Sequence, residues 1–251
     1  MRPTLFHLGG LAVQSYGVSK ALAVLAAGWL LARELRRVNR DPGLAYPLTL
    51  WTTVAGFAGA KVYYLAEHAG SLSSGDLGGT GFTWYGGLIA GAGAVLLVAR
   101  RHQLPIALTA GLSSAPRAVA YGIGRIGCLL AGDGTYGVPS SLPWAMSFPH
   151  GTVPTTQRVH PTPLYETLAM FLLAAVLWRL RDRLSPERLF ALFAIGMGAM
   201  RFLVEFVRRN ADVVLGLSQP QLWSLGLVAI GLVIVRRAGR ESTTAVAATS
   251  T

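Results

Sequence analysis

Long apolar segments separated by short polar loops run through most of the chain. Each segment approaches the roughly 20 residues that an α-helix needs to cross a bilayer. This pattern predicts an all-α polytopic membrane protein with about seven transmembrane helices. The predicted helices cover residues 11–32, 48–66, 83–99, 106–124, 162–180, 189–207 and 220–236.

The fourth segment is the least regular, because Pro105, Pro116 and several glycines interrupt it. Such interruptions are tolerated at membrane depth where helices pack together or line a cavity. Small residues also cluster at Gly86-Gly87, at Ala90-Gly91 and at 196–199. Because small residues let helix backbones approach closely, we expect tight helix packing at these places.

Arginines are distributed unequally between alternate loops. The loops after the first, third, fifth and seventh segments hold thirteen bases, and the other loops and the N-terminus hold four. Since cytoplasmic loops carry the excess of bases, this asymmetry predicts an outside N-terminus, a cytoplasmic C-terminus and an odd number of spans.

The predicted helices form one transmembrane domain, residues 1–240, and the length leaves no room for a second large domain. The loop 129–160 is long for a helix bundle and rich in glycine and proline, which indicates turns and short strands in a small extracytoplasmic insertion. Residues 241–251 are small and polar, so we expect a disordered C-terminal tail.

Composition supports the membrane interpretation, because 52% of residues are hydrophobic and only 13% are charged, against about 25% in soluble domains. The net charge of +11 would suggest nucleic acid on a soluble protein. Here the bases lie at helix ends, where they set topology and contact anionic headgroups. We therefore expect no nucleic-acid partner.

Three further features narrow the possibilities. The first apolar run is too long for the core of a cleaved signal peptide and leads into a basic loop, so it predicts a retained span. The single cysteine, Cys128, excludes an internal disulfide. The five histidines show no metal-ligand spacing, so we expect no metal site and no cofactor.

Ionisable residues inside the predicted helices gather in the outer half of the membrane. An arginine in hydrocarbon is costly and indicates function. Cations beside carboxylates at this depth suit a lipid with an anionic headgroup, because the guanidinium fork can hold phosphate through two bonds. Arg201 and Glu205 share a helix face, so Glu205 could hold that guanidinium or accept a proton. The gathered residues are Tyr16, Lys20, Lys61, Tyr85, Arg125, Tyr165, Glu166, Arg201 and Glu205.

Each residue also has a purely structural interpretation. A buried Arg–Glu pair can serve packing alone, and lysines near helix ends can reach the interface. Tyr16 and Tyr85 fit an aromatic belt, and His160 precedes a proline at the start of a helix. Cys128 is more often a small buried apolar group than a nucleophile. Their convergence at one depth is what favours a binding site.

Short motifs follow one another across nearly the whole chain. Each is weak evidence alone, but in this order they resemble the prolipoprotein diacylglyceryl transferase family. The motifs are Tyr16-Gly17, Tyr85-Gly86-Gly87-Leu88-Ile89, Gly124-Arg125-Ile126-Gly127, His160-Pro161, Leu164-Tyr165-Glu166, Arg201-Phe202, Val204-Glu205-Phe206 with Arg208, and Gly216-Leu217-Ser218-Gln219.

The resemblance implies a seven-span enzyme of the bacterial plasma membrane. Such an enzyme moves the diacylglyceryl group of phosphatidylglycerol onto the lipobox cysteine thiol of a preprolipoprotein and releases glycerol phosphate. It implies catalytic roles for Arg125, Arg201, Tyr85 and Glu205. The expected phosphatidylglycerol-binding residues are Arg125, Arg201, Tyr16, Lys61, Gly86, Gly87, Asp133, His160 and Glu166.

The chain departs from the family pattern at several positions. Tyr85 stands where the family usually has histidine, and Cys128-Leu129 replaces Asn-Phe. Ala131 and Asp133 replace an asparagine and a glutamate. Tyrosine is a poorer base than histidine unless a cation lowers its pKa, so the group that takes the thiol proton stays open.

Two other functions are compatible with these residues. One is a related membrane lipid transferase with a different acceptor or headgroup, which the changes at Tyr85 and Cys128 motivate. The other is a non-catalytic lipid-binding or transport protein, for which interrupted helices and charges at the membrane midplane would be typical. The position of the charges in the outer half and the absence of a visible repeat weigh against a transporter.

Overall fold

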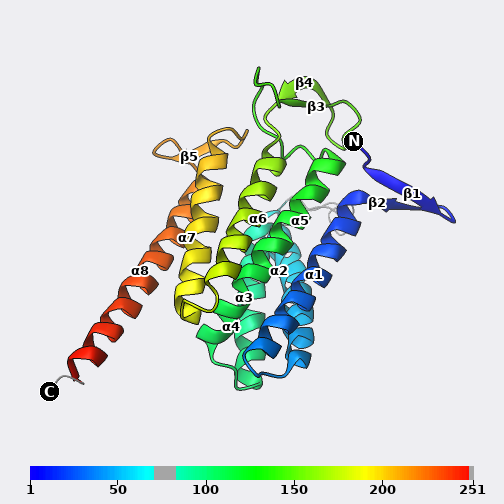
Figure 1. Ribbon diagram of the computed structural model, residues 1–251. Helices are drawn as coiled ribbons and strands as arrows, with labels where there is room; N and C mark the ends of the chain where they lie inside the picture. Colours follow the sequence, from blue (N-terminus) through cyan, green and yellow to red (C-terminus); the bar gives the residue numbers. More distant parts are fainter. Residues whose placement is uncertain (71–82, 249–251) are drawn as a thin grey trace. The chain divides into compact units, whose positions relative to one another are not determined.

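The computed structural model describes residues 1–70 and 83–248, without the side chains of residues 11, 84, 85 and 239–248. Most of the described residues are helical (Figure 1). The chain divides into two compact units. The first unit comprises Met1–Ala27 and Ala110–Thr251, and the second comprises Gly28–Thr109. Helix α1, Ser15–Arg37, crosses the division.

The second unit is built around two long helices that pack along each other. Helix α2 covers Ala45–Glu67 and helix α3 covers Trp84–Arg101. A short 3-10 helix, Pro42–Leu44, precedes α2, and the side chain of Asp41 caps it by accepting a hydrogen bond of 2.8 Å from the backbone N–H of Gly43.

Glycines allow α2 and α3 to touch backbone to backbone. A Cβ atom on Gly86 would overlap the carbonyl oxygen of Gly59 and the Cβ atom of Tyr63. A Cβ atom on Gly87 would lie 3.1 Å from the carbonyl oxygen of Gly56. The close packing predicted from the small residues near Gly86 is therefore confirmed.

The first unit holds four long helices that run side by side (Figure 1). Helix α6 packs against α5 and α7, and α8 packs against α7. The chain leaves α5 and α7 at the end where it enters α6 and α8, the upper end in Figure 1. The helices are α5 Ser114–Ala131, α6 Thr162–Leu180, α7 Pro186–Glu205 and α8 Gln219–Ala248.

Three antiparallel two-stranded sheets lie at the same end of the first unit. The first pairs β1, Thr4–Leu8, with β2, Leu11–Gln14. The second pairs β3, Met146–Phe148, with β4, Thr155–Val159. The third pairs β5, Asp212–Val214, with β6, Leu217–Ser218. The short strands predicted within the loop 129–160 are confirmed by β3 and β4.

The first predicted helix begins later in the structure than the sequence predicted. The predicted helix 11–32 begins only at Ser15, because Gly9 and Gly10 adopt positive φ angles of 51° and 90° and form a turn that pairs residues 11–14 with β1. At the other end α8 continues to Ala248. The disordered tail predicted for residues 241–251 stays a prediction, and its last three residues lie outside the described part of the chain.

The irregular fourth segment is broken into two helices. Helix α4, Ile106–Leu112, is separated from α5 by the single residue Ser113. Arg117 covers the break, since its Nη2 donates to the carbonyl of Ala110 at 2.9 Å and its Nε donates to that of Ser113 at 3.1 Å. The guanidinium thus satisfies backbone carbonyls that an interrupted helix leaves without partners.

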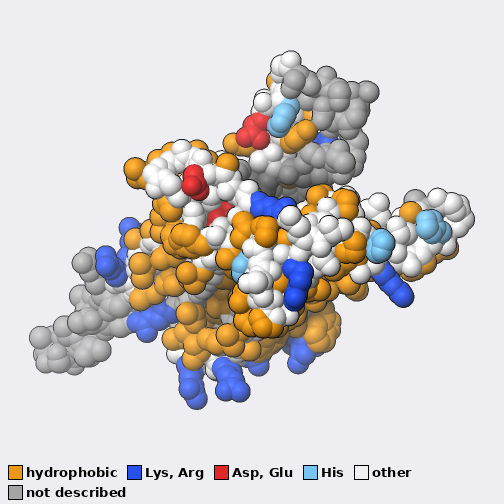
Figure 2. Space-filling view, turned by 90° about the horizontal axis from the view of Figure 1, so that it is seen from above, with side chains coloured by type: hydrophobic (Ala, Val, Ile, Leu, Met, Phe, Trp, Pro, Cys, Tyr) orange, Lys and Arg blue, Asp and Glu red, His pale blue; other side chains and the backbone are white. Residues whose placement is uncertain are grey.

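Among the described residues, three helices are long and apolar enough to cross a membrane by length and composition. They cover Ser15–Arg37, Thr162–Leu180 and Gln219–Ala238. Helix α7 carries four charged residues, Glu187, Arg188, Arg201 and Glu205, which lower its hydropathy. Hydrophobic side chains predominate on the face drawn in Figure 2. The count of seven spans stays a prediction.

The glycine contact between α2 and α3 gives a testable difference between two positions on one helix. Gly86→Ala should lower the unfolding temperature in detergent, because overpacking costs about 1–3 kcal/mol. Gly93→Ala is the matched control, since nothing lies within 4 Å of a Cβ atom there and alanine favours helix by about 1 kcal/mol. Equal unfolding temperatures for the two variants would contradict the packing described.

Candidate functional site

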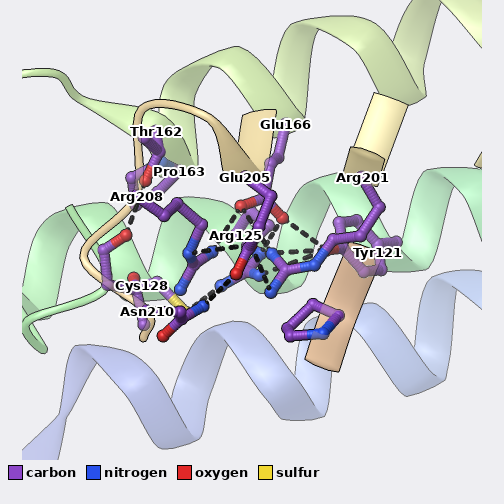
Figure 3. Close-up of polar contacts among 12 residues, drawn as sticks. Tyr121, Arg125, Cys128, Thr162, Pro163, Glu166, Arg201, Glu205, Arg208 and Asn210 are labelled. Atoms are coloured by element: carbon purple, nitrogen blue, oxygen red, sulfur yellow. Dashed lines mark hydrogen bonds and ion pairs between the residues drawn. The ribbon is translucent and has the colours of Figure 1, made fainter. Parts of the chain in front are cut away.

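A fully buried carboxylate in the first unit is surrounded by arginines. Glu166 lies in the first turns of α6. Its Oε2 lies 2.6 Å from Arg125 Nε, and its Oε1 lies 2.8 Å from Arg208 Nη1 and 3.3 Å from Arg201 Nη1. The hydroxyl of Tyr121 donates a hydrogen bond to Oε2. Figure 3 shows the three guanidiniums converging on this one side chain.

Close packing between α5 and α6 brings Arg125 to Glu166. The hydroxyl of Thr167, next to Glu166 on α6, donates a hydrogen bond of 3.2 Å to the carbonyl of Gly122 on α5. A Cβ atom on Gly122 would lie 2.6 Å from the ring of Phe171. Because Gly122 lacks a side chain, the helices approach closely enough for a direct ion pair.

A second buried carboxylate, Glu205, closes the other side of the group. Its Oε2 lies 3.3 Å from Arg201 Nη2 and 3.7 Å from Arg208 Nε. Its Oε1 accepts hydrogen bonds from Asn210 Nδ2 and, at 3.0 Å, from Ser218 Oγ. Within the described part of the chain, Oε2 has these ion-pair contacts but no hydrogen bond.

The charges of this arginine–glutamate cluster do not cancel. Arg125, Arg201 and Arg208 supply three positive charges, and Glu166 and Glu205 supply two negative ones, so the cluster carries +1. Burial, together with Arg201, lowers the pKa of Arg208, and Glu166 opposes this shift. An unbalanced buried charge is costly unless it is paired, so the cluster is suited to one anion.

Helix α1 approaches α5 beside Arg125. A Cβ atom on Gly127 would lie 2.6 Å from the Cβ atom of Ser19, and one on Gly124 would lie 3.3 Å from Lys20 Nζ. The two glycines thus admit α1 close to α5. This contact places Lys20 beside Gly124, the residue that precedes the predicted anion-binding residue Arg125.

Tyr16 and Cys128 lie in this same region. Arg125 Nη1 approaches Cys128 Sγ at 3.7 Å, and Tyr16 lies within electrostatic reach of Arg125, Cys128 and Asp133. The Tyr16 ring is stacked under Lys20 Nζ, 4.9 Å from the ring centre. Tyr16 is 42% exposed, whereas Cys128 is buried. A headgroup contact by Tyr16 is compatible with this position.

His160 and Asp133 make local contacts in and beside the loop between α5 and α6. His160 Nδ1 lies 3.2 Å from the hydroxyl of Tyr165, which also accepts a hydrogen bond of 2.8 Å from Trp144 Nε1. Asp133 Oδ1 accepts hydrogen bonds from the backbone N–H and the hydroxyl of Thr135, at 3.1 and 2.6 Å. These contacts stabilise the loop, and lipid binding by either residue stays a prediction.

Four predicted site residues belong to the second unit. Lys61 Nζ lies 5.7 Å from the ring centre of Tyr64. Gly86 and Gly87 pack against α2 as described above. The side chain of Tyr85 lies outside the described residues. The predicted roles of these four residues in catalysis or lipid binding stay predictions.

Sequence reasoning missed several members of the cluster. Arg208 was named only as a loop base and as part of a family-like motif, without a role in the site, although it follows Glu205 by three residues and so can reach the same side of α7. Tyr121 precedes Arg125 by four residues and gave a comparable signal. Asn210 and Ser218 lie beyond the end of α7, and no periodic pattern connects them to Glu205.

Comparisons with known proteins agree with the resemblance. A family model described as prolipoprotein diacylglyceryl transferase matches residues 3–237. A phosphatidylglycerol–prolipoprotein diacylglyceryl transferase of Clostridium tetani is 33% identical over 242 residues, which cover 93% of this chain and 96% of the relative. Enzymes of the same name from Rhodospirillum rubrum and Methylocella silvestris are 31% and 32% identical and cover 97% and 95% of this chain, each over 94% of its own length.

The buried position of Glu166 predicts a large effect of removing its charge. Glu166→Gln would leave three arginines with one carboxylate, and breaking a buried ion pair costs about 3–5 kcal/mol. We expect a clearly lower unfolding temperature in detergent. The matched control is Glu187→Gln, at an exposed position in the first turn of α7. A Glu166→Gln protein as stable as this control would show that the arginines do not depend on Glu166.

Proposed function

Because the chain belongs to the prolipoprotein diacylglyceryl transferase family, we propose that it transfers the diacylglyceryl group of phosphatidylglycerol to a prolipoprotein. The acceptor is the lipobox cysteine thiol of a secreted preprolipoprotein, and the other product is glycerol phosphate. The observation that supports this most strongly is the buried arginine–glutamate cluster with its single surplus positive charge.

The cluster matches the charge of the proposed lipid. The phosphodiester of phosphatidylglycerol carries one negative charge, and the cluster carries one positive charge in excess. Arg125 and Arg201 hold the phosphate in this proposal, since each guanidinium retains donors beyond those it gives to Glu166. Glu166, with both oxygens occupied, positions the arginines and does not itself contact the lipid.

The chemistry is a displacement at the glycerol carbon that bears the phosphate. The thiol loses its proton and its sulfur forms a bond to this carbon, while the bond from carbon to the phosphate oxygen breaks. The bonding electrons leave with glycerol phosphate, whose negative charge grows during the step. Arginines fixed beforehand around that oxygen stabilise the growing charge without reorganisation.

Glu205 is the proposed acceptor of the thiol proton. Asn210 and Ser218 occupy its Oε1, so these contacts fix the orientation of the carboxylate. Its Oε2 has no hydrogen bond among the described residues and faces Arg201, where the phosphate is proposed to bind. A base beside the bound lipid can take the proton as the sulfur attacks.

Orientation in the membrane follows from the same proposal. The chain spans the bacterial plasma membrane seven times, with the N-terminus outside and the C-terminus in the cytoplasm. The site end of the first unit then faces outside, where secreted preprolipoproteins arrive. At the opposite end, Arg181 and Arg183 lie in the connection from α6 to α7, and Arg179 and Arg188 lie in the adjoining helix turns. A basic loop of this kind stays in the cytoplasm.

An assay with phosphatidylglycerol vesicles and a lipobox peptide tests the proposed function. The wild-type protein should add one diacylglyceryl group to the peptide cysteine, detected by mass. Arg125→Ala and Arg201→Ala should each lower the rate by about 100-fold or more, as loss of charge stabilisation does. Arg183→Ala, at an exposed position in the loop after α6, is the matched control and should retain the wild-type rate.

Different failures of this assay have different meanings. Loss of phosphatidylglycerol without modification of the peptide would indicate a lipid transferase with a different acceptor. Movement of lipid across the vesicle membrane without a covalent product would indicate a transporter. A fully active Arg125→Ala or Arg201→Ala protein would remove that residue from the phosphate site.

Glu205→Gln separates proton transfer from lipid binding. The glutamine keeps the size of the side chain and an oxygen for Ser218, but it cannot accept the thiol proton. We expect kcat to fall by about 100- to 10,000-fold while the KM for phosphatidylglycerol changes little. A variant that raises KM with kcat unchanged would assign Glu205 to binding alone.

A further inference from the structure

The β5–β6 hairpin exposes a run of apolar side chains. Val213 is 63% exposed, Val214 is 50% exposed and Leu215 is 94% exposed. The hairpin lies between the end of α7 and the start of α8, so it connects two long helices of the first unit. Contiguous apolar surface on a folded protein generally marks an interaction site.

The turn at its tip places a leucine where the backbone disfavours one. Leu215 and Gly216 have φ angles of 53° and 69°. Two-residue hairpin turns with positive φ at both positions prefer glycine, asparagine or aspartate. The β1–β2 hairpin of the same chain follows this preference with Gly9 and Gly10. The fold alone therefore gives no reason for a leucine at the tip of β5–β6.

Exposed apolar side chains also lie on the helices that flank the hairpin. Leu203 near the end of α7 and Phe206 just after it are 65% and 62% exposed, and Leu225 in α8 is 46% exposed. Figure 1 shows the hairpin extending sideways at the level of the ends of α7 and α8, whereas β3 and β4 stand above α5 and α6. A sideways position beside membrane helices lies at the boundary between lipid headgroups and acyl chains.

We infer that the β5–β6 hairpin is an interfacial membrane anchor, with Val213, Val214 and Leu215 immersed in the phospholipid leaflet at the site end of the helices. Apolar side chains at this boundary gain free energy by leaving water. The partner is the phospholipid bilayer itself, because the hairpin leads directly into α8, a helix long and apolar enough to cross a membrane.

The anchor would act on the site through its two ends. Asn210 precedes β5 and Ser218 ends β6, and both donate hydrogen bonds to Glu205 Oε1. Strand pairing joins the ends, since Asp212 pairs with Ser218. Immersion of the tip in lipid therefore restricts the motion of the hairpin, and with it the positions of Asn210 and Ser218, which bind Glu205.

A depth measurement tests the anchor without relying on turnover. A nitroxide label is attached to Val213→Cys in the full-length protein, reconstituted in phosphatidylethanolamine and phosphatidylglycerol vesicles. Collision with oxygen, which concentrates in lipid, is compared with collision with a water-soluble nickel complex. Ser141→Cys, exposed in the outer loop, is the matched control, and the unsubstituted chain, whose Cys128 is buried, gives the labelling background.

The anchor predicts a higher oxygen-to-nickel collision ratio at residue 213 than at residue 141. Leu215→Asn keeps a residue that accepts positive φ and removes the apolar tip, so it should shift the ratio at 213 toward that at 141. Equal ratios at the two positions in the parent chain would overturn the inference. So would spin–spin broadening at residue 213, since it would indicate that a second copy covers the hairpin.

Discussion

The buried carboxylate of Glu166 is the constraint on which the site depends. A guanidinium inside a helix bundle cannot keep its hydration shell, so it must have a fixed anionic partner. Three arginines share Glu166, and the second carboxylate, Glu205, still leaves one positive charge without compensation. The folded protein therefore favours the binding of an anion at this cluster. The proposed binding of an acidic lipid headgroup would satisfy this preference.

Helix packing determines where that charge lies. Gly122 lets α5 meet α6, and Gly124 and Gly127 let α1 meet α5 beside Arg125. Arg125, Arg201 and Glu205 come from the ends of their helices that lie at one end of the first unit (Figures 1 and 3). A phosphate held there would leave its acyl chains alongside the apolar helix surfaces. The fold therefore serves a substrate that is half ionic and half hydrocarbon.

Much of this arrangement could be predicted from the sequence. Apolar segments gave the long helices to within a few residues at most ends, and the depth of Arg125, Glu166, Arg201 and Glu205 along their helices placed them together. Those four residues are charged in apolar surroundings, so their cost made them conspicuous. The chain order of family-like motifs led to the same residues, and the family itself is confirmed by the match over residues 3–237.

The rest depended on contacts that no periodic pattern encodes. Lipid binding by Glu166 stays a prediction, but no pattern showed that both of its oxygens contact arginine or tyrosine side chains. Asn210 and Ser218 reach Glu205 only because a hairpin returns the chain to the end of α7. Strand β2, Leu11–Gln14, was predicted as the start of a helix, since its first three residues are as apolar as those of a membrane span.

Solid-state nuclear magnetic resonance can test the central claim directly by measuring the distance between arginine side-chain nitrogens and lipid phosphorus. The protein is labelled with 15N-arginine and reconstituted with phosphatidylglycerol. A bidentate contact places guanidinium nitrogen within about 4 Å of phosphorus. The account predicts 31P dephasing of arginine signals that is clearly smaller in a variant lacking both Arg125 and Arg201, because only the arginines at the helix ends then contact lipid phosphates. Identical dephasing in the wild-type and double-variant proteins would contradict it, because the lipid phosphate would then be bound elsewhere.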